Sequence, residues 1–218
     1  KMVNELSSKN ELLSEEKELI AYENELKEKK TKLQQKNQLY DKVFSILNKD
    51  LLQLKTLLES TDKDSKDYSK NLKKACVYLS YIKRRSNLEI LHSQKENINI
   101  EEIILSIKES LLYLNECNIS ASLINEAKGE YDGNECILLY EFFQYYLKTC
   151  FDSLNEILIR IDSVNDQLSL RIISNVTDLS LEGFDHEKLN QYKGKLSSFT
   201  EDNLFYATLS FEKGGKTE

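Results

Sequence analysis

Residues 40–58, YDKVFSILNKDLLQLKTLL, carry the pattern that decides the fold of the N-terminal part of this chain. Their apolar side chains recur at alternating spacings of four and three residues: Tyr40, Phe44, Leu47, Leu51, Leu54 and Leu58. This spacing is typical of the two seam positions of a coiled coil. A lone helix cannot bury such a stripe, so the pattern predicts a helix that packs against partners.

Toward the N-terminus the heptad continues with only one apolar seam position. Leucine recurs every seven residues, at Leu12, Leu19, Leu26 and Leu33, while the second position is polar, at Glu16, Glu23, Lys30 and Asn37. We therefore expect one helix over residues 1–59, in which a weak coiled-coil signalling segment, residues 1–39, leads into a strongly apolar one. A parallel homodimer is the simplest way to cover this seam, and a plain spacer is the alternative.

A second helix is predicted after the polar stretch STDKDSKD, residues 60–67, which reads as a loop. This helix spans residues 68–92, and a stripe is expected to face the first helix: Leu72, Cys76, Leu79, Ile82, Leu88 and Leu91. Two antiparallel helices over residues 40–93, doubled in a homodimer, predict a dimerisation hairpin within a four-helix bundle.

Residues 94–218 are predicted to form an α/β sandwich with helices on one face of a mixed sheet. Asn99 is placed to cap a helix, with Glu102 at the reciprocal position of a capping box. The expected helices span residues 100–117, 135–151 and 187–192. The expected strands are residues 119–126, 156–162, 168–174, 195–200 and 204–211, the last four as two hairpins.

Composition limits the classes of partner. The 218 residues carry a formal net charge of −7; residues 1–75 hold 16 basic and 14 acidic side chains, which leaves 14 basic and 23 acidic for the rest. Nucleic-acid binding normally needs a basic surface, so that partner is not expected. No apolar run approaches ~18 residues, so no membrane span is predicted. We expect a cytoplasmic protein or, because Lys1 precedes Met2 as in an excised fragment, the cytoplasmic part of one tethered to a membrane through an upstream sequence.

The cysteines and histidines do not have the spacing of a metal site. Cys76, Cys117, Cys136 and Cys150 stand singly, without a CxxC pair, and the only histidines are His92 and His186. A zinc site is not expected, and four reduced, mostly buried thiols are.

The order of coiled coil, helical hairpin and α/β domain resembles that of bacterial sensor histidine kinases. Five local stretches resemble a branch common in Gram-positive bacteria: YIKRRSN (81–87), IEE (100–102), SIKESL (106–111), LLYEFF (138–143) and LSFEKGG (209–215). Over residues 38–215, the resemblance implies a dimerisation hairpin followed by an ATP-binding domain of the Bergerat type, acting in a two-component system.

The resemblance also implies where the phosphoacceptor histidine should stand. Alignment of the apolar positions puts Phe44 at the histidine position and Ser45 at the acidic position after it. Neither can accept a phosphoryl group as imidazole does, and Phe44 is expected to fill the seam. His92 lies at the end of the second helix, where these kinases do not place their acceptor, and is expected to be structural.

The implied nucleotide site is degenerate. Glu141 matches the acidic residue that acts as base, but Tyr145 replaces the asparagine that holds magnesium. Asp178 follows the strand that supplies an adenine-binding aspartate, yet the chain contains no GxG, and too few residues remain before Gly194 for a phosphate-binding lid. Magnesium prefers hard oxygen ligands, so we expect no ATP or magnesium cofactor and no catalytic residue.

Lys83, Arg84 and Arg85 form a basic cluster in an acidic domain. Two interpretations stay open: contact with a phosphate or with the acidic pocket of a response-regulator receiver partner, and pairing with acidic residues of the same or a neighbouring chain.

Three functions compete at this stage. The first is a histidine-kinase-like signalling homodimer that has lost phosphotransfer. The second is an active kinase with divergent motifs that phosphorylates another acceptor such as His92. The third is a structural coiled-coil adaptor whose domain shares only the architecture, since a fold does not fix a function.

Overall fold

The structure is a computed structural model that describes residues 2–60, 68–164, 167–176 and 179–211, with side chains from residue 16 onward except Val164. The chain divides into two compact units, residues 1–46 and residues 47–218. We call them the N-terminal unit and the C-terminal unit. Residues 61–67 of the loop predicted at 60–67, residues 165–166 between the strands of the first predicted hairpin, Asp178 and the end of the LSFEKGG stretch lie outside the described residues.

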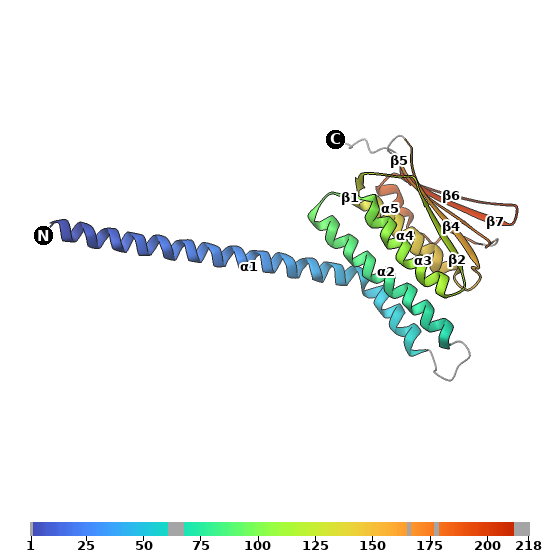
Figure 1. The fold of residues 1–218 in the computed structure, drawn as a ribbon, viewed down its shortest axis with the longest axis horizontal. Coiled ribbons are helices and arrows are strands. Elements are labelled where there is room, and N and C mark those ends of the chain that lie inside the picture. The colour runs from blue at the N-terminus through green and yellow to red at the C-terminus, as the bar shows by residue number, and fades with distance from the viewer. Residues whose placement is uncertain (1, 61–67, 165–166, 177–178, 212–218) are drawn as a thin grey trace. The chain divides into compact units, whose positions relative to one another are not determined.

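The N-terminal unit is the first part of one continuous helix, α1 (Met2–Glu59), coloured blue at the N-terminus in Figure 1. The prediction of a single helix over residues 1–59 is confirmed. The seam leucines Leu19, Leu26 and Leu33 are 59, 48 and 59% exposed. Other polar side chains of this segment pair locally, such as Lys29 Nζ with Glu25 Oε1 at 2.6 Å.

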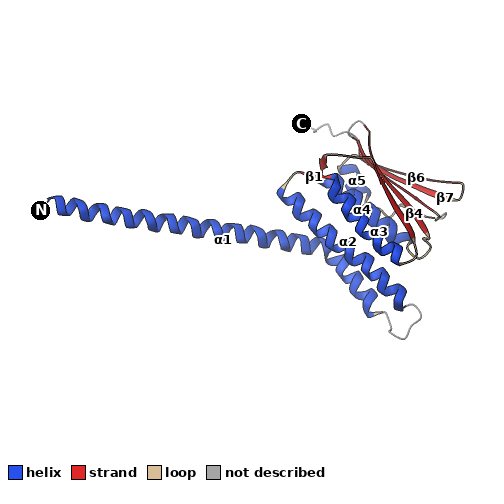
Figure 2. Ribbon diagram, viewed as in Figure 1, coloured by secondary structure: helices blue, strands red, loops and turns tan. Residues whose placement is uncertain are grey.

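In the C-terminal unit the last turns of α1, from Leu47, are joined by four helices: α2 (Tyr68–Gln94), α3 (Ile100–Glu116), α4 (Gly133–Cys150) and α5 (His186–Gln191). Helix α2 packs against α3 and α4 (Figure 2). Asn99 caps α3 as predicted, by accepting a hydrogen bond from the backbone N–H of Glu101.

The predicted stripe of α2 is only partly buried within one chain. Ile82 and Leu88 are buried, but Leu72 and Leu79 are 44 and 55% exposed. The buried face of α2 includes Val77, Ser80 and Tyr81 instead. The reason is that α2 lies on the helical layer of the α/β domain, which the heptad spacing of the hairpin alone does not reveal.

The main sheet has five strands in the order β2 (Ser120–Asn125), β4 (Glu156–Val164), β5 (Gln167–Ser174), β7 (Leu204–Phe211) and β6 (Gly194–Glu201). Strands β2 and β4 are parallel, and the other neighbours are antiparallel. The predicted mixed sheet with two hairpins is therefore confirmed. The turn between β6 and β7 has Asp202 and Asn203 at φ 50° and 61°, as a two-residue hairpin turn requires.

Two short strands were missed from the sequence. β1 (Asn97–Asn99) pairs antiparallel with β3 (Glu130–Asp132). Each is three residues long with a single apolar or aromatic residue at its centre, Ile98 or Tyr131, which is too short to show an alternating hydrophobic pattern. Their pairing brings the starts of α3 and α4 together, because each strand leads directly into one of these helices.

The core lies between the sheet and the pair α3 and α4, which cover one of its faces (Figure 1). Along β5 and β7 buried residues alternate with half-buried or exposed ones, as expected for a sheet covered on one side. The fold is a helical segment followed by an α/β sandwich, as predicted.

Candidate functional site

Helix α4 supplies the candidate site because it carries both Glu141 and Tyr145. It begins at Asp132, whose Oδ1 accepts hydrogen bonds from the backbone N–H groups of Asn134 at 2.8 Å and Glu135 at 3.3 Å. Four aromatic side chains of α4 are fully buried: Tyr140, Phe142, Phe143 and Tyr146. A helix with so much buried apolar surface is fixed firmly in the domain, and its polar side chains are held in place with it.

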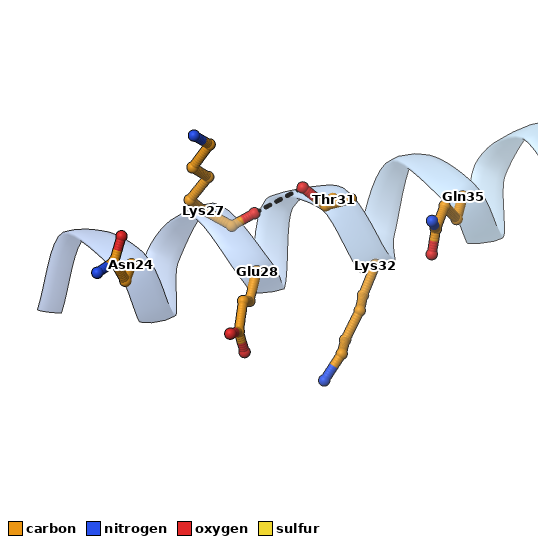
Figure 3. A pocket seen from close by; sticks show the side chains of 6 residues that line it. All are labelled: Asn24, Lys27, Glu28, Thr31, Lys32 and Gln35. Carbon is orange, nitrogen blue, oxygen red and sulfur yellow. Dashed lines mark hydrogen bonds between the residues drawn. The ribbon is translucent and has the colours of Figure 1, made fainter. Parts of the chain in front are cut away.

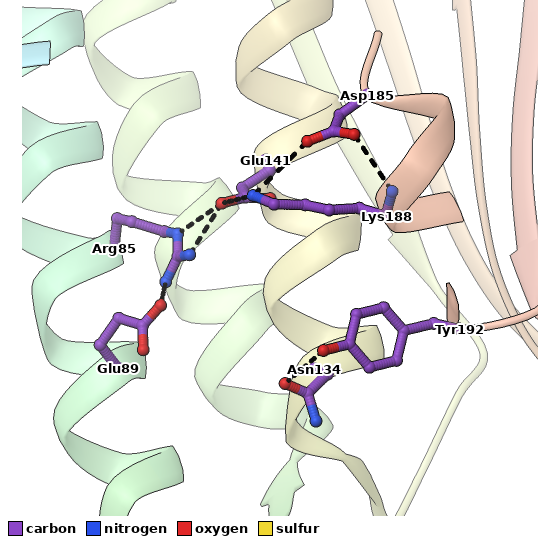
Figure 4. A network of polar contacts seen from close by, with 7 residues as sticks. All are labelled: Arg85, Glu89, Asn134, Glu141, Asp185, Lys188 and Tyr192. Atoms are coloured by element: carbon purple, nitrogen blue, oxygen red, sulfur yellow. Dashed lines mark hydrogen bonds and ion pairs between the residues drawn. The ribbon is translucent and has the colours of Figure 1, made fainter. Parts of the chain in front are cut away.

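Glu141 is held between two cations (Figure 4). Its Oε1 accepts hydrogen bonds from Arg85 Nη2 at 2.7 Å and Arg85 Nε at 3.2 Å, and its Oε2 lies 3.3 Å from Lys188 Nζ. Arg85 comes from α2 and Lys188 from α5, so the carboxylate joins three helices. Both carboxylate oxygens of Glu141 are therefore already engaged by cations of the same chain.

Arg85 is 3% exposed and also forms an ion pair with Glu89 one helical turn away. Burial acts to lower the pKa of Arg85, but the charges of Glu141 and Glu89 outweigh that effect and the pKa is raised. Arg85 therefore stays a cation inside the fold. Buried arginine is tolerated only when such partners compensate its charge.

Tyr145 lies against the segment that precedes α5. The ring of Phe184 lies 5.4 Å from the ring of Tyr145 and 5.4 Å, edge to face, from the ring of Phe142. Phe184 is 6% exposed. A Cβ atom added at Gly183 would come within 2.9 Å of the Tyr145 hydroxyl. The face of α4 that carries Tyr145 is therefore packed with aromatic side chains.

The structure does not bring Phe44 or His92 into this site. Phe44 belongs to the N-terminal unit and is 61% exposed, so within one chain it is not the core residue that its seam position predicts. His92 packs on the start of α4, where its ring occupies the space beside Gly133 that a Cβ atom would need. Its Nδ1 is buried without a hydrogen-bond partner.

The basic cluster is paired within the chain. Lys83 Nζ lies 2.9 Å from Glu109 Oε1, and Arg84 binds the other oxygen of the same carboxylate. With Arg85 on Glu141, all three cations contact carboxylates of the same chain. Only Lys83, 58% exposed in its side chain, presents much surface to solvent, so its contact with a partner stays a prediction.

Sequence reasoning missed a second polar contact of α4. Lys148 Nζ forms an ion pair with Asp50 of α1 and lies 3.2 Å from Gln53 Oε1. The same ammonium lies 5.4 Å from the ring centres of Tyr78 and Tyr81 of α2. The available signal was the lone lysine in an otherwise apolar stretch, YYLKTCF, residues 145–151.

Other kinds of site are not found in the described part of the chain. It contains no group of three or more His, Cys, Asp or Glu placed to hold a metal ion. None of its helices combines the length and apolar character that crossing a membrane requires. A shallow pocket on α1 is lined by Asn24, Lys27, Glu28, Thr31, Lys32 and Gln35 (Figure 3). Because all six belong to one helix, it cannot enclose a ligand.

Comparison with known proteins gives only distant similarity. No family model and no curated protein matches the chain. Three similar solved structures each align with 78% of it. A bacterial phosphotransferase is 10% identical over 93% of its own chain, with a TM-score of 0.47, and the histidine kinase domain of the blue-light activated histidine kinase EL346 from Erythrobacter litoralis is 7% identical over 94%, with a TM-score of 0.48. The histidine kinase AdeS from Acinetobacter baumannii is 10% identical over 94% of its chain, with a TM-score of 0.43. With TM-scores below 0.5, these similarities decide neither family nor activity.

Proposed function

We propose that this chain is a histidine-kinase-like signal-transduction protein that is deficient in phosphotransfer. The proposal starts from the order of coiled coil, hairpin and α/β domain, and from the local stretches that resemble sensor kinases. The main observation in its support is the set of contacts that Glu141 and Tyr145 of α4 make. Its remnant base Glu141 is neutralised by Arg85 and Lys188, and Phe184 packs over Tyr145.

This arrangement is poorly suited to nucleotide chemistry. Magnesium needs several hard oxygen ligands, and on this face of α4 the aromatic rings of Tyr145 and Phe184 stand together. A nucleotide on the face of α4 that carries Tyr145 would have to displace Phe184, which is buried, and returning a phenylalanine side chain to water costs about 1.5–3 kcal/mol. We therefore propose that the domain has kept the scaffold and lost ATP and magnesium as cofactors.

The proposed signal is conformational and passes through a homodimer. The exposed leucines of α1 in the N-terminal unit, and Leu58, Leu72 and Leu79 in the C-terminal unit, are large apolar side chains without cover in one chain. A second copy would bury them, with residues 1–39 as a parallel coiled coil, residues 40–93 as half of a four-helix bundle and residues 94–218 as the degenerate ATP-binding domain. We propose a cytoplasmic site of action for this dimer, and a response-regulator-like partner at Lys83.

Calorimetric titration of the full chain with ATP in the presence of magnesium tests the loss of the cofactor. We expect no binding heat up to about millimolar nucleotide, and magnesium alone serves as the control. A dissociation constant in the micromolar range, about −8 kcal/mol of binding free energy, would show that the site still works and would overturn the proposal.

Incubation with labelled ATP tests the loss of phosphotransfer separately. We expect no covalent label on the chain. An acid-labile, base-stable label that disappears in His92→Ala would identify a phosphohistidine and favour an active kinase with a divergent acceptor. The matched control is His186→Ala, which removes the only other histidine.

A further inference from the structure

Two charged residues of α4, Glu141 and Lys148, are each bound by a different helix of the hairpin. They are seven residues apart, which is about two helical turns, so they lie on the same side of α4. Arg85 of α2 binds Glu141, and Asp50 of α1 binds Lys148. The signs are opposite at the two ends, because the hairpin offers a cation at one and an anion at the other.

Both contacts are shielded from solvent. The side chains of Arg85 and Glu141 are 4 and 17% exposed, and those of Lys148 and Asp50 are 25 and 17% exposed. Tyr81 of α2 lies near both ends: its ring stands 5.5 Å from that of Tyr140 and 5.4 Å from Lys148 Nζ. Burial and the negative charges of Asp50 and Glu141 raise the pKa of Tyr81. Charged pairs in such a setting are screened little by dissolved salt.

The surface between the two pairs is incompletely satisfied. Gln144 lies three residues after Glu141 and four before Lys148, hence on the same side of α4. It is 2% exposed, and its Oε1 has no hydrogen-bond partner. A buried acceptor without a donor opposes docking. The contact is therefore specific in register but not as stable as it could be, which is what a contact that opens and closes requires.

We propose that the two ion pairs of α4, one with α1 and one with α2, can form together only in one relative position of these two helices, and we call this pair of contacts the latch. The latch consists of Asp50–Lys148 and Arg85–Glu141. A shift of α1 against α2 by one helical turn moves a side chain by about 5.4 Å, which is beyond the reach of an ion pair. One pair must then break, and α4 loses its ionic contact with one of the two helices. This inference rests on the proposed relay for its role, but its contacts do not depend on nucleotide.

Amide hydrogen exchange of the full chain, without nucleotide, tests the latch. Asp50→Lys places like charges at the Lys148 end, and we expect exchange in residues 141–150 to rise by about tenfold or more, because local opening of a docked helix governs its exchange. Combining Asp50→Lys with Lys148→Asp restores the pair with reversed signs, and exchange should return to within about twofold of the original.

Glu59→Lys is the matched control. It reverses an acid on the same helix whose partner Lys55 is 67% exposed, and exchange in α4 should stay unchanged. If Asp50→Lys also raises exchange throughout β4, β5 and β7, the fold has been lost, and Asp50→Asn is judged by the same criterion. Unchanged exchange in α4 with either variant, or no recovery in the swapped pair, would overturn the latch.

A second measurement tests whether the two ion pairs of α4 act cooperatively. Arg85→Met and Asp50→Asn are compared with the double variant. A single latch predicts that the double variant exchanges no faster than about twice the faster single variant, because one broken pair already frees α4. If the two contacts were independent, the increases in exchange rate of the two single variants would multiply in the double variant, and this result would contradict the latch. Binding of ATP would overturn the proposed function without altering any of these exchange results.

Discussion

The helix of the N-terminal unit and helix α4 are both rich in large apolar side chains, but they differ in where these are buried. Leu26 and Leu33 of α1 are 48 and 59% exposed, whereas Phe142 and Phe143 of α4 are fully buried. Helix α4 obtains its stabilisation from its own chain through α2 and the sheet. The apolar stripe of α1 in the N-terminal unit is exposed in one chain, where it stabilises the helix little; the proposed homodimer would bury it.

The largest effect is expected in the core. Phe143→Ala should lower the free energy of unfolding of the C-terminal unit by about 3–5 kcal/mol, because it leaves a cavity in a fully buried site. Urea unfolding measures this. The control is Phe199→Ala, whose ring is 54% exposed and stacks on Tyr206, with an expected loss of less than ~1.5 kcal/mol. Equal losses would contradict the assignment of the core.

The next effect concerns association through α1 and should not involve α4. Leu26→Asn with Leu33→Asn should raise the dissociation constant of the homodimer by about 100-fold or more, because polar residues replace two seam positions. Sedimentation measures the association, and urea unfolding of the C-terminal unit should not change. The control is Glu28→Asn with Gln35→Asn, which alters positions off the seam. A wild-type chain that sediments as a monomer at all concentrations would refute the proposed dimer.

A smaller effect depends on pH and concerns the start of α4. Burial, with the charge of Asp132, raises the pKa of Glu135 from 4.5 to about 7. The folded state thus binds a proton that the unfolded state releases, so stability should fall as the pH rises from about 4.5 to about 7. Glu135→Gln should remove this slope from the urea midpoints. Glu101→Gln, an exposed acid in the first turn of α3, should leave the slope in place.

The smallest effect is expected at the exposed ion pair of α1. Lys29 and Glu25 are 69 and 60% exposed in their side chains, so Lys29→Ala should cost no more than about 0.5 kcal/mol of thermal stability. Added salt should remove even this difference, since ions screen exposed charges. A loss several times larger would mean that the coiled-coil helix is more buried than the single chain shows.

Much of the fold could be predicted because its signals are local. The heptad leucines indicated α1, Asn99 marked the start of α3, and alternating residues in β4, β5 and β7 marked the hairpins. Strands β1 and β3 could not be predicted, because three residues are too few to show a periodicity. Their pairing is a contact over more than thirty positions of sequence, which no local pattern reports.

The candidate site was predicted in part. Glu141 and Tyr145 were identified through the resemblance to sensor kinases, and the basic cluster through its charge. That Arg85 reaches Glu141, and that Phe184 packs on Tyr145, could not be read from spacing. Such contacts depend on how α2 and the segment before α5 pack on α4.

The sequence by itself determined the five helices and the five strands of the main sheet among the described residues, and that the expected acceptor histidine and glycine loops are missing. Those properties follow from backbone preference and from residue identity. The tertiary structure decided which charges are compensated: Arg85 and Glu141, 56 positions apart, and Lys148 and Asp50, 98 positions apart, meet only in the folded chain. Electrostatic pairing depends on distance in space, and the fold alone sets that distance.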